Sequence, residues 1–402
     1  MIQSQHEREN QLLRLCLRPQ PGAGHLSLTR QLFHHDLDWE YIYNFSVRHS
    51  LLPFLYHQLK QVGRELVPGE YLKRFKTAYH ANVARTAIFT DELLSITREL
   101  QLSGIESLPF KGPVLGAIAY GNPALRSFID LDLIVRRGDV LAAKEILLAR
   151  GYRTSRRIDD RQQQLLLDSQ HNIQFERTDG CLIVELHWRV SADWYAAAWG
   201  PEQLWKRLGT VTLNDVPLNS LSIEDLLLAL CIHGSRHFWE KLCWICDVAA
   251  LISGDREIDW DGLLTFARRS DTEGIVLLGL CLAGAIAPEA LPAAIKQLIA
   301  EDERLNRLAG RLTKRLFSGT EHVPLTRRET FKYSMLMRKS WPARVRYCLF
   351  ALSPADLDLE TLALPRYLNF VYYGVRPLRL VRSSYHRLRT SRTELGNSGR
   401  GT

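Results

Sequence analysis

The sequence of 402 residues predicts an α+β fold, in which a small mixed β-sheet is flanked by helical regions on its N-terminal and C-terminal sides. Three observations support this prediction. Apolar residues recur with the helical period of about 3.6 through residues 7–103. The same period returns after residue 223. Between the two regions, short apolar runs with a period of two alternate with glycine turns and single helices.

The composition is that of an ordinary globular protein. Hydrophobic residues make up 46% and charged residues 24% of the chain, which excludes a disordered or fibrous class. The opening residues lack the apolar core of a signal peptide. The longest apolar run, residues 275–287, is shorter than the roughly 20 residues that span a membrane. We therefore expect a cytoplasmic protein with two or three domains.

The N-terminal region, residues 1–103, is expected to be helical. Its longest helix is predicted over residues 69–102, and Ser103 with Gly104 should end it, because these residues disfavour helix continuation. We expect this region to form a separate helical part that precedes the sheet.

The predicted α/β core covers residues 104–220. A short strand is expected at residues 105–110, and a glycine turn and a helix should follow it. The second strand is expected within residues 126–135, and the next helix at about residues 139–150. The order is therefore strand, turn, helix, strand, helix.

A β-hairpin is predicted next, with strands at residues 171–178 and 181–190. Asp179 and Gly180 join them, and an Asp-Gly pair between alternating apolar runs is a strong hairpin signal. On the second strand the period of two places Glu185 on one face with Cys181, Ile183, His187 and Arg189. A further carboxylate is thus expected on a strand of the core.

The rest of the chain is expected to be a helical subdomain at residues 221–320 and an arginine-rich helical tail at residues 321–402 with a disordered end. Residues 363–402 hold eight arginines and one acid, so they carry +7 of the net charge of +8. Three interpretations stay open. The tail packs on the protein body, makes peripheral contact with an anionic membrane through residues 366–392, or binds nucleic acid.

The seven cysteines show no disulfide framework. Cys243 and Cys246 form a C-x-x-C pair within a helical pattern, and no second pair lies nearby. We expect buried helix cysteines here in preference to a zinc or thiol redox site.

Asp130 and Asp132 are the most informative residues of the core. They interrupt an apolar strand two positions apart, so both side chains point to the same face. Two ionised carboxylates side by side are unfavourable unless a cation neutralises them. The pattern therefore indicates a divalent metal site, with a solvated acidic edge strand as the alternative.

Together, "LPFKGPVLGAIAYGNPALRSFIDLDLIV" and "IVELHWRV" resemble a bacterial family of uncharacterised nucleotidyltransferases of the DNA polymerase β-like superfamily, over roughly residues 35–315. The resemblance implies that Gly112 forms a phosphate turn. It also implies that Asp130, Asp132 and Glu185 are catalytic and hold two Mg²⁺ ions, or Mn²⁺, for in-line transfer of a nucleoside monophosphate from an NTP.

The phosphate turn departs from the usual glycine-serine or glycine-glycine pattern of that superfamily, because Pro113 follows Gly112 and has no N–H to offer a phosphate. We expect the charge of Lys111 to compensate. Arg126, at the start of the Asp strand, is predicted to bind the triphosphate, and the alternative is a solvated turn arginine.

His187 and Lys241 are the remaining predicted nucleotide-binding residues. His187 shares a face with Glu185, where it either supports the metal ligands as a hydrogen-bonding partner, contacts substrate or makes a local hydrogen bond. His233, His237 and Lys241 recur every four residues, so we expect one polar stripe on one helix. Lys241 is assigned to phosphate, with a solvated stripe as the alternative, and Asp247 is a candidate for orienting this stripe.

The leading functional hypothesis is an NTP- and Mg²⁺-dependent nucleotidyltransferase. Its acceptor is a hydroxyl of a small molecule, a peptide, a protein or an RNA end, and the sequence does not distinguish these. The alternative is an inactive nucleotidyltransferase fold that acts as a nucleotide- or partner-binding scaffold, with a basic tail for membrane or nucleic acid. Buried carboxylates without a metal are costly, which argues against this alternative.

Overall fold

The computed structural model describes residues 6–33, 36–154, 167–168, 170–191, 201–319, 323, 325–351 and 371. The chain divides into two compact units. The first comprises residues 1–155 and 171–337, and the second residues 156–170 and 338–402. The described part of the second unit contains helix α17 (Trp341–Ala351). The sheet and every predicted site residue belong to the first unit.

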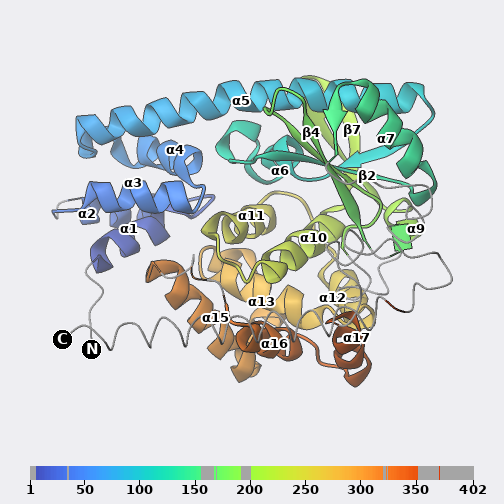
Figure 1. The fold of residues 1–402 in the computed structure, drawn as a ribbon. Helices are drawn as coiled ribbons and strands as arrows, with labels where there is room; N and C mark the ends of the chain where they lie inside the picture. The colour runs from blue at the N-terminus through green and yellow to red at the C-terminus, as the bar shows by residue number, and fades with distance from the viewer. Residues whose placement is uncertain are drawn as a thin grey trace, which may run out of the picture. The chain divides into compact units, whose positions relative to one another are not determined.

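The helical N-terminal region is confirmed. Its helices are α1 (Glu7–Cys16), α2 (Ala23–Leu32), α3 (Trp39–Arg48), α4 (Leu52–Gly63) and α5 (Gly69–Leu102). Helix α5 ends where the sequence predicts, because Gly104 adopts a left-handed φ of 75° that a helix cannot continue. Helix α5 packs against α3 and α4 and also against β1 and α7, so it runs past both the helical region and the sheet (Figure 1).

A mixed five-stranded sheet forms the core and confirms the α+β class. Its strands are β1 (Ser107–Pro109), β2 (Asp130–Val135), β3 (Tyr152–Arg153), β4 (Asn172–Arg177) and β5 (Ile183–His187), in the order β1-β2-β5-β4-β3. Strands β2 and β5 are parallel, and the other neighbours are antiparallel. The predicted hairpin is β4–β5, and Gly180 in its turn has a φ of 72°.

The register of β2 and β5 determines which side chains meet. Asp132 lies opposite Glu185. One face of this strand pair buries Leu131, Leu133 and Val184, which therefore belong to the core. The opposite face carries the carboxylates. The apolar face fixes the register, because a slip of one residue would expose it to water.

Helices α6 (Gly112–Tyr120) and α7 (Val140–Ala149) follow β1 and β2 as predicted. A second hairpin, β6 (Leu208–Leu213) and β7 (Val216–Leu221), has no counterpart among the predicted strands. Its turn residues Asn214 and Asp215 both have positive φ, 46° and 61°, which suits a tight hairpin turn. Asn214 and Asp215, between two runs of alternating residues, were the signal from which the sequence could have predicted this hairpin.

The helical C-terminal part consists of short helices. They are α10 (Ile223–Arg236), α11 (Leu242–Ile252), α12 (Trp260–Arg269), α13 (Glu273–Gly284), α14 (Ala293–Glu301), α15 (Glu303–Phe317) and α16 (Arg327–Leu336), whereas the single-turn helix α9 (Pro201–Leu204) precedes the second hairpin. Within the described ranges, none of the helices has the length and apolarity required to cross a bilayer.

The single polar stripe predicted through His233, His237 and Lys241 is wrong. Helix α10 ends at Arg236, with His237 as its C-cap, and Lys241 is the extended N-cap residue of the separate helix α11. The side chains therefore belong to two helices and the turn between them.

A close contact between Trp239 and Gly234 accompanies this break. Phe238 and Trp239 have positive φ of 53° and 52°, and the Trp239 N–H donates to the Gly234 carbonyl at 2.8 Å. The indole packs directly on Gly234, where a Cβ would lie 2.4 Å from the ring. Only glycine leaves room for the returning chain. The break is thus set by packing that helical periodicity does not reveal.

Gly234→Ala should destabilise the fold by about 1–3 kcal/mol, because the added methyl overpacks the Trp239 contact. Urea unfolding at pH 7 measures this effect. Gly310→Ala is the control, since nothing lies within 4 Å of that position in α15. The control should gain about 0.5–1 kcal/mol from helix propensity. Equal effects in both variants would contradict the packing explanation.

A buried histidine gives the fold a pH dependence. His49 accepts a hydrogen bond from the Leu242 N–H at 3.3 Å, and burial, reinforced by Arg48, lowers its pKa to about 4. The unfolded chain binds a proton at this position near pH 6.5, so stability is full above pH 6.5 and falls as the pH drops towards 4.

Between pH 7 and pH 5, the free energy of unfolding of His49→Gln should fall by about 2 kcal/mol less than that of the wild type. Urea unfolding at both pH values measures the difference, in which contributions from other histidines cancel. An identical pH dependence in the two proteins would show that His49 is not the group responsible.

Candidate functional site

Three side chains from β2 and β5 meet on the polar face of the sheet. His187 Nε2 lies 3.1 Å from Asp132 Oδ1 and 3.2 Å from Glu185 Oε2. Their potential ligand atoms all lie within 4.8 Å of one another. The parallel register brings Asp132 and Glu185 together, and the period of two adds His187 from the same strand.

Two further polar side chains hold this cluster. Lys111 Nζ donates to Asp132 Oδ1 at 2.9 Å, and Asn172 Nδ2 donates to Glu185 Oε2 at 2.9 Å. Lys111 precedes the turn at Gly112, whose φ is 53°. A Cβ on Gly112 would lie 3.2 Å from the Asp130 carbonyl, so glycine lets this turn approach β2 closely.

The cluster is a network of mutually neutralising charges. Burial would raise the pKa of Asp132, but Lys111 and His187 hold it well below its usual range. Burial would likewise raise the pKa of Glu185, and the hydrogen bond from His187 lowers it. Burial disfavours protonated His187, yet its bonds to both carboxylates raise its pKa. In this structure Lys111 and His187 therefore supply the positive charge that the buried carboxylates require.

Asp130 lies on the same face but outside this group of ligand atoms. Burial and the neighbouring Asp132 charge raise the pKa of Asp130 to about 6. Its side chain lines the cleft described below. The structure therefore groups Asp132 and Glu185 with His187, whereas the metal role of Asp130 stays a prediction.

The cluster has the donors that a divalent cation needs. Asp132 Oδ2 is buried and has no hydrogen-bond partner in the described part of the chain. The potential ligand atoms of Asp132, Glu185 and His187 lie within 4.8 Å of one another, and they are two carboxylates and an imidazole, which are ligand types for divalent cations. The residues present thus fit a metal ion, with His187 as a potential ligand, a role that the sequence analysis did not assign to it.

A cleft of about 530 Å³ opens above the cluster. Six of the predicted site residues line it, namely Lys111, Arg126, Asp130, Glu185, His187 and Lys241. The other two, Gly112 and Asp132, are buried beneath it. Arg85 and Arg236 add positive charge to the lining and were not predicted. No local sequence pattern marks them, because they come from helices far apart in the chain.

The helical side of the cleft carries three aromatic rings in mutual contact. The His233 and His237 centroids lie 4.8 Å apart, and both are within 5.2 Å of Trp244. Burial, aided by the Arg236 charge, lowers the pKa of His237 to about 4, and burial lowers that of His233 well below its usual value. Both imidazoles are therefore neutral near pH 7, so they are not phosphate-binding cations.

Arg126 is held by a carboxylate on the neighbouring helix. Its Nε lies 3.0 Å from Asp247 Oδ2 and 3.2 Å from Oδ1, and the side chains are 11% and 1% exposed. The alternative of a solvated turn arginine is therefore wrong. Asp247 therefore orients Arg126, which lines the cleft, and not the predicted stripe.

Cys246 of the C-x-x-C pair is buried, as expected, whereas Cys243 is half-buried and lines the cleft. Cys246 is inaccessible, and burial raises the pKa of Cys243 to about 12. Neither thiol belongs to a group of metal-binding side chains within the described residues. Both cysteines act as helix packing residues.

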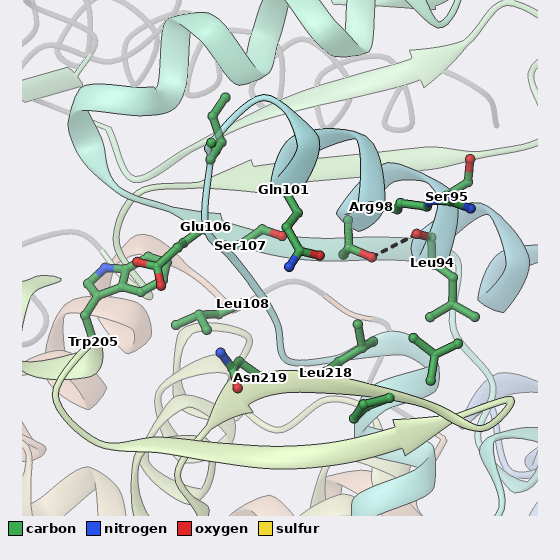
Figure 2. A pocket seen from close by; sticks show the side chains of 15 residues that line it. Leu94, Ser95, Arg98, Gln101, Glu106, Ser107, Leu108, Trp205, Leu218 and Asn219 are labelled. Carbon is green, nitrogen blue, oxygen red and sulfur yellow. Dashed lines mark hydrogen bonds between the residues drawn. The ribbon is translucent and has the colours of Figure 1, made fainter.

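A larger cavity, of about 850 Å³, lies between the C-terminal half of α5, β1 and β7 (Figure 2). Leu108, Leu218 and Trp205 give it an apolar character, with Gln101 and Asn219 among its polar groups. None of the predicted site residues lines it. The smaller cleft, in contrast, is lined by both basic and acidic side chains, so it is the candidate site.

Comparisons with known proteins identify a family for this chain. A family model described as an uncharacterised nucleotidyltransferase matches residues 35–288, a range that contains all predicted site residues. No curated protein matches the chain. A crystal structure of an antigenic nucleotidyltransferase-like protein from Paracoccidioides brasiliensis aligns with 53% of this chain and 96% of its own, at 15% identity. Its TM-score of 0.30 is too low to support any argument.

Lys111→Met should destabilise the metal-free protein by about 3 kcal/mol, because it leaves the Asp132 charge buried and less well paired. Thermal and urea unfolding in the presence of a chelator measure this loss. Added Mg²⁺ or Mn²⁺ should stabilise the variant more than the wild type, since the cation then neutralises Asp132.

Lys144→Met is the matched control. The Lys144 side chain is 15% exposed, against 14% for Lys111, but it pairs at 3.5 Å with the largely exposed Glu145. Its loss should cost under about 1 kcal/mol and show no metal dependence. Similar losses in both lysine variants would mean that Lys111 does not neutralise a buried charge.

Proposed function

The chain belongs to the uncharacterised nucleotidyltransferase family, and from this premise we propose that it is a metal-dependent enzyme that transfers a nucleoside monophosphate from an NTP to a hydroxyl-type acceptor. The observation that carries the proposal is the meeting of Asp132, Glu185 and His187 beneath a cationic cleft. The bacterial origin and the polymerase β-like ancestry of the family stay predictions.

The charge of the cleft favours an anionic ligand. Lys111, Arg126, Lys241, Arg85 and Arg236 line it, against the two acids Asp130 and Glu185. A polyphosphate suits such an excess of cations. The volume of about 530 Å³ lies within the range of small-molecule and cofactor sites. An NTP donor meets both requirements.

Asp132, Glu185 and His187 are the residues that would hold the metal, and we assign Asp130 as a further carboxylate for a second ion. When bound, divalent ions supply charge stabilisation at the reacting phosphate and increase the acidity of an attacking hydroxyl. Mg²⁺ prefers oxygen ligands, whereas an imidazole also suits Mn²⁺. The donor set therefore accommodates both predicted metals, with His187 favouring Mn²⁺.

The remaining residues have roles that follow from their contacts. Asn172 and His187 hold Glu185, and its lowered pKa makes it a weak general base, so we assign it to metal holding. Lys111 neutralises Asp132 in this structure. Its ammonium lies at the cleft and becomes available to a donor phosphate once another cation faces Asp132.

One observation favours the scaffold alternative. Asp132 already has two partners from the chain, the Lys111 ammonium and His187, whose pKa its contacts with the carboxylates raise, so the buried carboxylate does not by itself require a metal. A metal-free nucleotide-binding protein is compatible with this arrangement. The arginine-rich tail cannot distinguish the two functions, because residues 366–392 lie outside the described part of the chain except for residue 371.

Asp132→Asn should abolish Mg²⁺-dependent NTP binding and lower turnover at least about 100-fold, because it removes the shared charged ligand. Isothermal titration with each of the four NTPs, with and without Mg²⁺, measures binding. Release of pyrophosphate measures turnover. Glu176→Gln is the control, since Glu176 lies on β4 of the same sheet, is exposed and does not line the cleft.

The two functions give different results in this experiment. Metal-independent NTP binding that survives Asp132→Asn, without pyrophosphate release, would support the scaffold. No binding of any NTP to the wild type would overturn both functions.

A further inference from the structure

A buried acid lies just behind the cleft without touching it. Asp247 is fully buried in α11, one helical turn after Cys243 and Trp244, which line the cleft. Its partners are the Arg126 Nε and the Tyr120 hydroxyl, which donates to Oδ1 at 2.9 Å. Neither Asp247 nor Tyr120 lines the cleft. Of the residues in this hydrogen-bonded group, Arg126 is the one that lines the cleft.

Arg126 keeps most of its donors available. A guanidinium has five N–H donors, and only the one on Nε is used by Asp247. Within the described residues, neither terminal nitrogen of Arg126 has a hydrogen-bond partner. The residue lines the cleft, and these terminal donors are not used by Asp247.

The backbone that carries Arg126 is held from another direction. Asn82 Nδ2 on α5 donates to the carbonyl oxygens of Ala124 and Arg126, at 2.8 and 3.1 Å. Arg85, one turn later on α5, donates to the Phe128 carbonyl. Helix α5 thus fixes the backbone of this loop, while α11 fixes the side chain. An arginine with so little remaining freedom loses little entropy when it binds an anion.

Stability alone does not explain the pair. Removing two charges from water costs about as much as their attraction returns, so a buried ion pair is weak evidence for a stabilising role. Burial, assisted by the Asp247 charge, raises the pKa of Tyr120 well above its usual value, so this hydroxyl remains a neutral donor. The arrangement is a paired carboxylate whose cationic partner lines the cleft and keeps its terminal donors unused.

We infer that Asp247 and Tyr120 are positioning residues that preset Arg126 to bind the polyphosphate of the donor. This inference rests on the proposed function, because it assumes a polyphosphate ligand in the cleft. Asp247 fixes the guanidinium plane and Tyr120 fixes Asp247. The terminal N–H groups of Arg126 then meet phosphate oxygens without reorganisation.

The test uses inorganic tripolyphosphate with Mg²⁺ as the probe, since it presents the phosphates without a nucleobase. Isothermal titration compares the wild type with Arg126→Gln, Asp247→Asn and the double variant. Arg126→Gln and Asp247→Asn should each weaken binding about tenfold, as expected for a charge-assisted contact. The double variant should bind less than about twofold more weakly than Arg126→Gln alone, because the effect of Asp247→Asn acts through Arg126.

Two further variants separate positioning from folding. Tyr120→Phe removes one hydrogen bond and should weaken binding about threefold with little change in melting temperature. It also keeps the test decisive if Asp247→Asn fails to fold. Asp225→Asn is the matched control, because Asp225 is equally buried and pairs with Arg207 at 2.8 Å, and neither residue lines the cleft. It should lower stability without changing tripolyphosphate affinity.

The outcomes distinguish this inference from the proposed function. If the wild type binds tripolyphosphate and neither Asp247→Asn nor Tyr120→Phe weakens it, the positioning role is wrong while the nucleotide-binding proposal stands. If the double variant loses affinity by the product of the two single losses, the positioning role is also wrong. If the wild type binds neither tripolyphosphate nor any NTP, the proposed function and the inference fail together.

Discussion

The parallel pairing of β2 and β5 is the constraint on which the site depends. It places the buried Asp132 directly opposite the half-buried Glu185, on the face of the sheet beneath the cleft. Two carboxylates in that position must be neutralised. The contact of Lys111 and the insertion of His187 between the acids both answer this requirement. The close turn at Gly112 also contributes to this neutralisation, because the turn brings Lys111 to β2.

The cleft above this cluster brings together parts of the chain with different roles. The sheet supplies the acids, and α5 with the loop before β2 supplies Arg85 and Arg126. The break between α10 and α11 turns neutral imidazoles and Trp244 towards the same space. An anionic phosphate chain next to a flat, uncharged group is the kind of ligand that this division of charge suits. A nucleotide has both parts, which is consistent with the family to which the chain belongs.

The sequence predicted much of the fold because local rules agree with the tertiary structure there. The end of α5 follows from Gly104, and the β4–β5 hairpin from Asp179 and Gly180. The β6–β7 hairpin was missed although Asn214 and Asp215 marked its turn. The continuous stripe through Lys241 failed because a tertiary contact interrupts the helix. The contact of Trp239 with Gly234 outweighs helical periodicity at that point.

For the site, the sequence alone determined which side chains share a face. The period of two in a strand places Asp130 beside Asp132 and Glu185 beside His187, whatever the rest of the fold does. Only the tertiary structure decided that these two faces meet, since the register of β2 and β5 joins residues 53 positions apart. It alone also paired Arg126 with Asp247, 121 positions away. Local patterns encode backbone periodicity, whereas long-range contacts depend on packing the whole core.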